Sequence, residues 1–205
     1  MLFQYITRGG VLMIPIALCS VLIVTIVIER MVKLAAAKTN EEKLMNDIEA
    51  ALRGKDRAQA VKVCRGAKGM LPRILEQGIA VGVRVKHVEK RMARAASLEI
   101  QALETPVMWL STIATVAPLC GLLGTVTGMI KAFITIEQQG GKVNATLLAG
   151  GIWEALLTTA AGLIVAIPAF IAYDYLMSIV DRHAASVEQA AQSVIDTMVE
   201  EGIIE

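Results

Sequence analysis

Three long apolar segments constrain this chain more than any other feature. They cover residues 11–28, 107–130 and 147–173. A helix needs about 20 residues to cross the ~30 Å hydrocarbon core of a membrane, and each segment approaches or exceeds that length. Backbone groups in lipid must be hydrogen-bonded within the segment itself, so we expect helices rather than strands. The sequence therefore predicts an all-α integral membrane protein with three transmembrane helices.

The first segment is predicted to be a retained membrane helix and not a cleaved signal peptide. Glu29, Arg30 and Lys33 follow it directly, before any small-residue cleavage site. The alanines at 35–37 come only after these charges, which is too late for a signal-peptide cleavage site.

The positive charges predict how the chain crosses the membrane. Of the 20 lysines and arginines, 16 lie between Arg30 and Arg94. The positive-inside rule then places residues 29–106 in the cytoplasm. It follows that residues 1–10 and the short connection 131–146 are periplasmic, and that the C-terminal helix 174–205 is cytoplasmic. Ten acidic residues share the basic segment, so we expect a solvated face of mixed charge and no nucleic-acid binding.

Both later spans are predicted to continue as helices outside the membrane. After Tyr173, apolar residues recur at alternating steps of four and three, which is typical of a helical seam; they are Val180, Ala184, Val187, Ala191, Val194 and Met198. The third helix should therefore run unbroken to about residue 200, and its seam needs the second-span helix or a neighbouring subunit as a partner. The second span should similarly begin as a helix near His87. The fold class is thus three transmembrane helices, the second and third extended into a long cytoplasmic helical bundle.

The remainder of the cytoplasmic segment is predicted to form three short helices. Thr39 and Glu42 have the spacing of a capping box for the first. Asp56 can cap the second, which should end near Gly66. Pro72 suits the first turn of the third, which should end at about Gly82.

Glu154 is an acidic residue inside the third apolar segment. A carboxylate at the centre of a membrane helix costs roughly 2.5–3.5 kcal/mol, and such groups usually face a bundle interior or a water-filled path for ions or protons. The alternative is that Glu154 lies near the membrane surface, or is a structural hydrogen-bond partner. Around the helix it lies about 140° from Thr159 and about 40° from Thr158, so we expect it to meet a neighbouring subunit or line a separate cavity.

Polar and small side chains form two stripes on the second and third spans. On the second span Ser111, Thr115, Pro118 and Thr125 share one face, which predicts either a polar path or a helix interface. On the third span small residues predict a close approach of another helix. That stripe contains Ala155, Thr159, Gly162, Ala166, Ala169 and Tyr173.

Two motifs resemble those of the ExbB/TolQ/MotA proton-channel family. The second span reads PLCGLLGTVTGM over residues 118–129, and the third reads GIWEALLTTAAGLIVAIP over residues 151–168. The N-terminal GGVLMIP at 9–15 and the Glu29-Arg30 pair look like the ExbB branch. The usual four-span layout of the MotA branch does not fit three spans.

The resemblance implies a homopentamer in the bacterial inner membrane whose second and third spans line a central pore. Two single-span partner helices of ExbD, TolR or MotB type would sit in that pore, each with an aspartate that accepts and releases protons. Thr125 and Thr159 match the family's pore-facing threonines, Glu154 matches its third-span glutamate, and Thr158 adds a second hydroxyl. Proton flow would then drive a transducer of TonB or TolA type.

The leading prediction is an ExbB-type, proton-driven motor subunit that energises TonB-dependent transport across the outer membrane. A TolQ-type subunit of a Tol-Pal-like or other related motor is one alternative, and a non-conducting membrane scaffold is another. The sequence shows no nucleophile–base pair, no phosphate-binding glycine loop and no metal-ligand cluster, so no enzyme, cofactor or metal is predicted. The spacing of Cys19, Cys64 and Cys120 suggests no disulfide or metal site.

Overall fold

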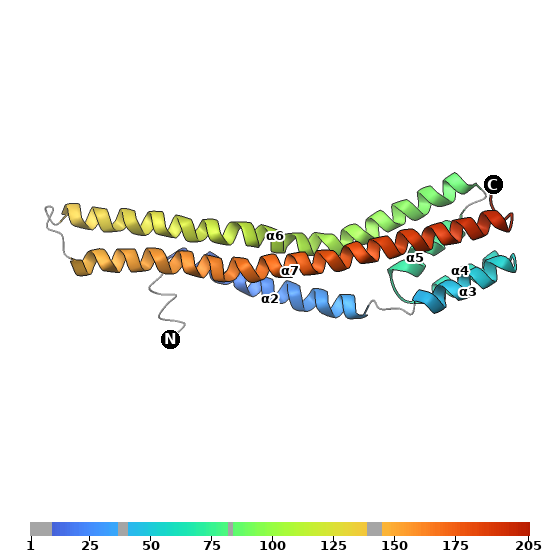
Figure 1. Cartoon of the computed structure of the whole chain (residues 1–205), viewed down its shortest axis with the longest axis horizontal. Coiled ribbons are helices and arrows are strands. Elements are labelled where there is room, and N and C mark those ends of the chain that lie inside the picture. The colour runs from blue at the N-terminus through green and yellow to red at the C-terminus, as the bar shows by residue number, and fades with distance from the viewer. Residues whose placement is uncertain (1–9, 37–40, 82–83, 139–144) are drawn as a thin grey trace. The chain divides into compact units, whose positions relative to one another are not determined.

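The computed structural model describes residues 10–36, 41–81, 84–138 and 145–205, and within these ranges the only regular elements are helices (Figure 1). They are α2 (Met13–Ala36), α3 (Glu41–Arg53), α4 (Arg57–Gly66), α5 (Met70–Ile79), α6 (Val85–Gln138) and α7 (Ala145–Glu200). Three of them, α2, α6 and α7, are long and apolar enough to cross a membrane. The predicted all-α membrane fold with two long helices is confirmed.

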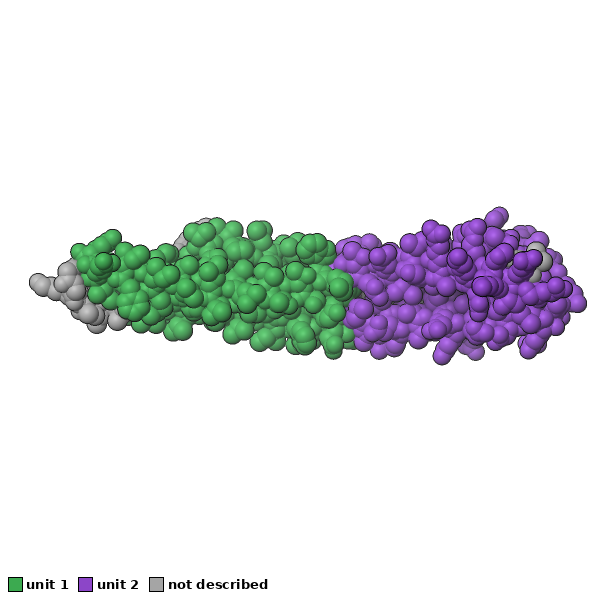
Figure 2. Space-filling view, turned by 90° about the horizontal axis from the view of Figure 1, so that it is seen from above, with its two compact units in different colours: residues 1–28, 107–175 green, residues 29–106, 176–205 purple. Residues whose placement is uncertain are grey.

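The chain divides into two compact units, coloured green and purple in Figure 2. Unit 1 contains residues 1–28 and 107–175, and unit 2 contains residues 29–106 and 176–205. Helices α6 and α7 each contribute residues to both units, as expected for membrane spans that continue as helices. The candidate proton-path residues all belong to unit 1.

The short helices begin close to where their capping signals place them. The Asp56 side chain accepts a hydrogen bond from the Gln59 backbone N–H at 2.9 Å, so the predicted cap of α4 is confirmed. Helix α5 begins at Met70 with Pro72 in its first turn, and it ends at Ile79 rather than at Gly82. Thr39 and Gly82 lie outside the described residues, as do 1–9 and 139–144 of the two predicted periplasmic segments.

Helix α2 begins at Met13 and ends at Ala36. It therefore continues past residue 28, where the predicted span 11–28 ends. Its last turns carry charges that stabilise one another: Lys33 donates to the Glu29 carboxylate four residues earlier at 2.6 Å. The helix therefore continues through the charges that follow the apolar segment. Which residues lie within the bilayer remains a prediction.

The seam of α7 has its partners within this chain. Val187, Val194 and Met198 are buried in the core of unit 2. That core also contains residues of α3, α5 and the first turns of α6, among them Leu52, Leu75, Ile79, Val88 and Met92. The short helices, which the sequence did not suggest as partners, therefore cover much of this seam.

Candidate functional site

Within unit 1, helices α6 and α7 pack through their smallest residues. Gly121, Gly124 and Gly128 of α6 lie against Thr159, Thr158 and Ala155 of α7, an order that makes the two helices antiparallel. A Cβ atom added to Gly121 would lie 2.9 Å from the Thr159 Cα atom, so only glycine allows this approach. Close backbone contact of this kind supplies packing and hydrogen bonding where lipid provides no hydrophobic driving force.

The small stripe of α7 forms the other half of this contact. Ala155, Ala166 and Ala169 are buried, and a Cβ atom on Gly162 would lie 2.5 Å from the Ala117 carbonyl oxygen. The stripe thus faces α6 of the same chain. The packing of this stripe against α6 does not test whether the stripe also lines a pore, and that role stays a prediction.

The adjacent threonines of α7 use their hydroxyls differently. Thr159 donates a hydrogen bond across the helix pair to the Gly121 carbonyl at 2.9 Å. Thr158 is 1% exposed, and its hydroxyl donates to the Glu154 carbonyl of its own helix at 2.8 Å. The Thr158 side chain occupies the space that the missing side chain of Gly124 leaves. Thr159 therefore links α7 to α6, whereas Thr158 fills the interface.

Glu154 has a cationic partner on the neighbouring helix. The Lys131 ammonium of α6 donates to the Glu154 carboxylate at 3.0 Å, with the two side chains 62% and 29% exposed. The pairing compensates part of the cost of holding a carboxylate in an apolar segment. Glu154 is therefore held as one member of an ion pair.

A small cavity of about 260 Å³ opens beside this pair. Its lining comes from three parts of unit 1: Gly10 before α2, Thr127 and Lys131 on α6, and Glu154 and Thr158 on α7. Gly10 has a φ of +71°, and a Cβ atom there would lie 2.5 Å from the Glu154 Oε1 atom. The backbone conformation favours glycine here, and any other residue would also displace the Glu154 carboxylate from its present position.

The hydroxyl face of α6, defined by Ser111, Thr115 and Thr125, is not buried against another part of the described chain. Thr115 donates to the Ser111 carbonyl at 3.0 Å, and Thr125 donates to the Leu122 carbonyl at 2.6 Å. Pro118, on the same face, is half-buried, and α6 continues through it. The face leaves room for a further helix, and whether it forms a proton path or an interface stays a prediction.

Sequence reasoning missed Lys131 and Gly10. The signal for Lys131 was available, since Lys131 and Glu154 lie at similar distances from the connection that joins their helices. Antiparallel neighbours at similar distances from a turn meet side by side. Gly10 offered no such signal, because its contact depends on where the chain enters α2. Among the described residues no group of three His, Cys, Asp or Glu side chains is placed to hold a metal ion.

Comparison with known proteins agrees with this architecture. Residues 66–189 match the model of the MotA/TolQ/ExbB proton channel family. The chain is 33% identical over 180 residues to an ExbB-like biopolymer transport protein of Synechocystis, covering 84% of this chain and 69% of that protein. It is 28% identical over 190 residues to the biopolymer transport protein exbB1 of Vibrio cholerae, covering 90% and 83% respectively.

A Tol-Pal relative is also similar over a shorter stretch. The protein TolQ of Haemophilus influenzae is 45% identical over 94 residues, covering 45% of this chain and 40% of TolQ. The family match covers more than half of the chain and includes both packed spans and Glu154. This chain belongs to the MotA/TolQ/ExbB proton channel family.

Proposed function

We propose that the chain is the channel-forming, stator-like subunit of a motor in the bacterial inner membrane that is driven by the proton-motive force. The observation that carries the proposal is the hydroxyl face of α6. Within one chain α7 packs on the glycine side of α6 and leaves Thr115 exposed and Ser111 and Thr125 only partly buried. Hydroxyl side chains are common where membrane helices pack together and can bond across helices, so this face is best placed on the inside of an assembly.

The assembly we propose is a homopentamer that surrounds a dimer of single-span partner helices of ExbD type. Each partner helix would carry a carboxyl group at the level of Thr125 and Thr159. Support comes from the family membership and from the two motifs. The energy available is ~2.3 kcal/mol for each proton that crosses 100 mV of membrane potential.

The hydrogen bonds of the two threonines suggest how they would serve a titrating carboxyl group. Both hydroxyl protons are donated to backbone carbonyls, by Thr125 to Leu122 and by Thr159 to Gly121. Each hydroxyl oxygen can therefore accept a hydrogen bond from a protonated carboxyl group. To serve a deprotonated carboxylate, the hydroxyl must rotate and release its backbone carbonyl. The two protonation states of the partner would thus favour two hydroxyl orientations.

We propose that residues 29–106 and 174–205 are cytoplasmic, while residues 1–10 and 131–146 are periplasmic, because of the basic residues near the spans. The spans proposed to cross the bilayer are 11–28, 107–130 and 147–173. Within the family, an ExbB-type role that drives a TonB-like transducer is favoured by the long matches to ExbB-named relatives. A TolQ-type role is the second candidate, favoured by the 45% identity with the Haemophilus TolQ segment.

Native mass spectrometry of the detergent-solubilised chain, alone and co-expressed with a single-span partner, tests the proposal. We expect five copies alone and five copies with two partner copies after co-expression. A monomer or dimer that ignores the partner would exclude the motor. A pentamer that binds the partner but conducts no protons in liposomes would instead indicate a scaffold. Depletion in cells separates the two motor roles: an ExbB-type subunit is needed for energy-dependent uptake, a TolQ-type subunit for outer-membrane constriction.

A further inference from the structure

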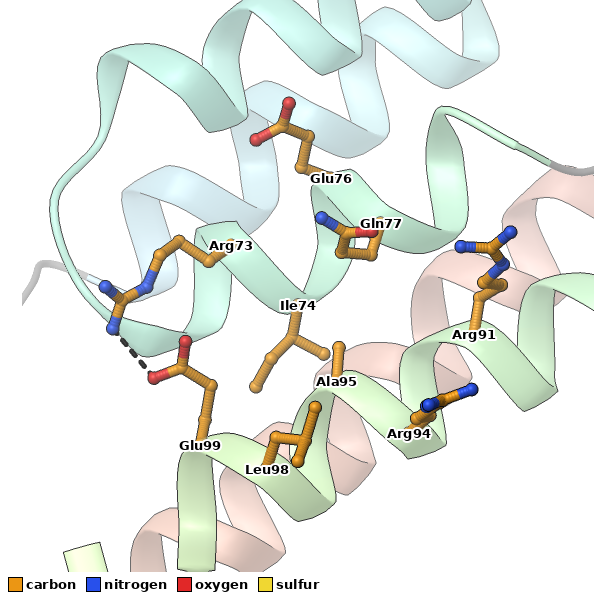
Figure 3. A pocket seen from close by; sticks show the side chains of 9 residues that line it. All are labelled: Arg73, Ile74, Glu76, Gln77, Arg91, Arg94, Ala95, Leu98 and Glu99. Atoms are coloured by element: carbon orange, nitrogen blue, oxygen red, sulfur yellow. Dashed lines mark hydrogen bonds and ion pairs between the residues drawn. The ribbon is translucent and has the colours of Figure 1, made fainter. Parts of the chain in front are cut away.

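A groove between α5 and α6 in unit 2 combines charged side chains, three of them arginines, with apolar ones (Figure 3). Its volume is about 610 Å³. Helix α5 contributes Arg73 and Gln77 to the lining, and helix α6 contributes Arg91, Arg94 and Leu98. None of these residues belongs to the proposed proton path, so the groove requires an explanation of its own.

The two carboxylates on the groove are already paired. Glu99 accepts from Arg73 at 2.8 Å, and Glu76 accepts from Arg65, outside the groove, at 2.8 Å. Arg91 and Arg94, in contrast, form no ion pair with any part of the chain that the structure describes. Their guanidinium groups are exposed, and Figure 3 shows both extending from the same side of α6. The groove therefore carries two uncompensated positive charges.

A second hollow of about 290 Å³ is lined by the same two arginines. Arg91 and Arg94 line it together with Val81, His87 and Lys90. This second hollow has no acidic lining residue. Arg91 and Arg94 thus belong to both depressions.

Exposed apolar side chains mark the two depressions. Leu98 in the first is 60% exposed, and Val81 in the second is 51% exposed. Along α6, His87, Arg91, Arg94 and Leu98 follow one another at steps of three or four residues, and Val81 lines the hollow that contains His87. A ligand that lies along this row meets Leu98, then the two guanidinium groups, then the hollow that contains Val81. A free phosphate would use only the central charges, and a phospholipid would place its apolar part on one side alone.

We propose that Arg91 and Arg94 bind a short acidic peptide segment of a partner protein, with apolar residues on both sides of its carboxylates. Guanidinium groups three residues apart on a helix are neighbours and can bind adjacent carboxylates. From His87 to Leu98 the helix advances about 16 Å, which an extended peptide of about five residues covers. The partner lies on the side of the membrane where unit 2 lies. The site does not depend on the proposed motor function.

The test is fluorescence polarisation with a labelled peptide, Leu-Glu-Asp-Glu-Leu, and the detergent-solubilised full chain. The double variant R91E/R94E should bind the peptide at least about tenfold more weakly, because attraction becomes repulsion at both positions. The matched control is R53E/K62E, which also reverses two charges, since Arg53 on α3 and Lys62 on α4 are exposed and form no ion pair among the described residues. A thermal melt shows whether each variant remains folded.

A second peptide, Glu-Leu-Asp-Leu-Glu, has the same composition but places acids at its ends. It should bind about fivefold more weakly, because its apolar residues no longer reach Val81 and Leu98. Equal binding of the two peptides, or equal binding by R91E/R94E and R53E/K62E, would overturn the proposal. So would displacement of the first peptide by inorganic phosphate or by phosphatidylglycerol vesicles at constant ionic strength, since the natural ligand would then be a phosphate or a lipid.

Discussion

The Lys131 ammonium and the Glu154 carboxylate lie 3.0 Å apart, one on α6 and the other on α7. Gly10 adds the backbone surface against which the carboxylate is seated. The arrangement gives Glu154 a partner within its own chain, so its charge does not require a neighbouring subunit. It also makes Lys131 the residue whose removal should most affect Glu154.

Replacing Lys131 with methionine should leave Glu154 without its partner and lower the stability of unit 1 by about 1 kcal/mol, as for a partly exposed ion pair. The double variant K131M/E154Q should be more stable than the sum of the single effects predicts. The measurement is a double-mutant cycle on thermal unfolding in detergent.

The control for this cycle is K33M, which removes the exposed pair between Lys33 and Glu29 on one helix. Its effect should be at most about 0.5 kcal/mol. A coupling energy near zero between Lys131 and Glu154 would show that the contact does not contribute to stability.

Alanine at Gly162 should destabilise the pair of α6 and α7 by about 1–3 kcal/mol. The added Cβ atom would lie 2.5 Å from the Ala117 carbonyl oxygen, and a backbone atom cannot move aside easily. The matched control is Gly150→Ala in the same helix, where nothing lies within 4 Å of the added atom. Thermal unfolding of the two variants should differ clearly; similar melting temperatures would contradict the packing.

Valine at Thr125 should preserve assembly and reduce proton-driven function about tenfold, the effect of one lost hydrogen bond of ~1.4 kcal/mol. Valine has nearly the same shape as threonine but cannot accept or donate a hydrogen bond. Native mass spectrometry checks the assembly, and proton flux into liposomes containing the partner complex checks the function.

Thr112→Val is the control for this experiment. Thr112 is exposed on a different face of α6, where its hydroxyl donates to the Met108 carbonyl. Its replacement should leave the flux unchanged. Equal loss in both variants would mean that any hydroxyl on the helix matters, and full flux in Thr125→Val would remove Thr125 from the path.

The Cys64 thiol should make the chain less stable at high pH. Burial, with the nearby Glu76 carboxylate as the smaller cause, raises the pKa of Cys64 to about 11. The ordinary thiol pKa is about 8.5, so the unfolded chain loses this proton first. The stabilisation is complete below about pH 8.5 and is lost as the pH rises towards 11, at about 1.4 kcal/mol per pH unit.

Thermal unfolding of the parent chain and of Cys64→Ala between pH 7.5 and pH 10.5 tests this. The Cys64→Ala variant is less stable than the parent at every pH because it leaves a cavity. Only the parent loses stability through ionisation of the thiol, so the difference in unfolding free energy between the two should become smaller as the pH rises. A constant difference across the range would mean that Cys64 ionises equally in the folded and unfolded chains.

Much of this fold could be predicted because membrane helices have strong sequence signals. The apolar segments predicted α2, α6 and α7, and Asp56 predicted the start of α4. The length of α2 beyond Ile28 was missed, because a helix can continue through charged residues that pair with one another. The second-span helix was predicted as a partner of the α7 seam, and its Val88 and Met92 do lie in the same core. The short helices were missed, because the seam pattern shows that a face is buried but not everything that buries it.

The candidate site was less predictable for a related reason. Periodicity placed Glu154 about 140° from Thr159 around the helix, yet both side chains bond to α6, Glu154 to Lys131 and Thr159 to Gly121. Which hydroxyl crosses to α6 depends on the rotation of α7 against Gly121 and Gly124, which no single helix pattern contains. The seating of Glu154 on Gly10 depends on a chain segment more than a hundred residues away.

Helix α6 packs against α7 with one face and presents the hydroxyl face next to it. The first face contacts α7 through glycines and backbone atoms, and the second bears Ser111, Thr115 and Thr125. Contacts made by backbone atoms and methyl groups do not require water to drive them, so the helical hairpin should form as soon as both spans are inserted. The α6–α7 hairpin of each chain would then be folded before the chains assemble. Substitutions on the hydroxyl face would consequently alter which helices can bind there without disrupting the contact between α6 and α7.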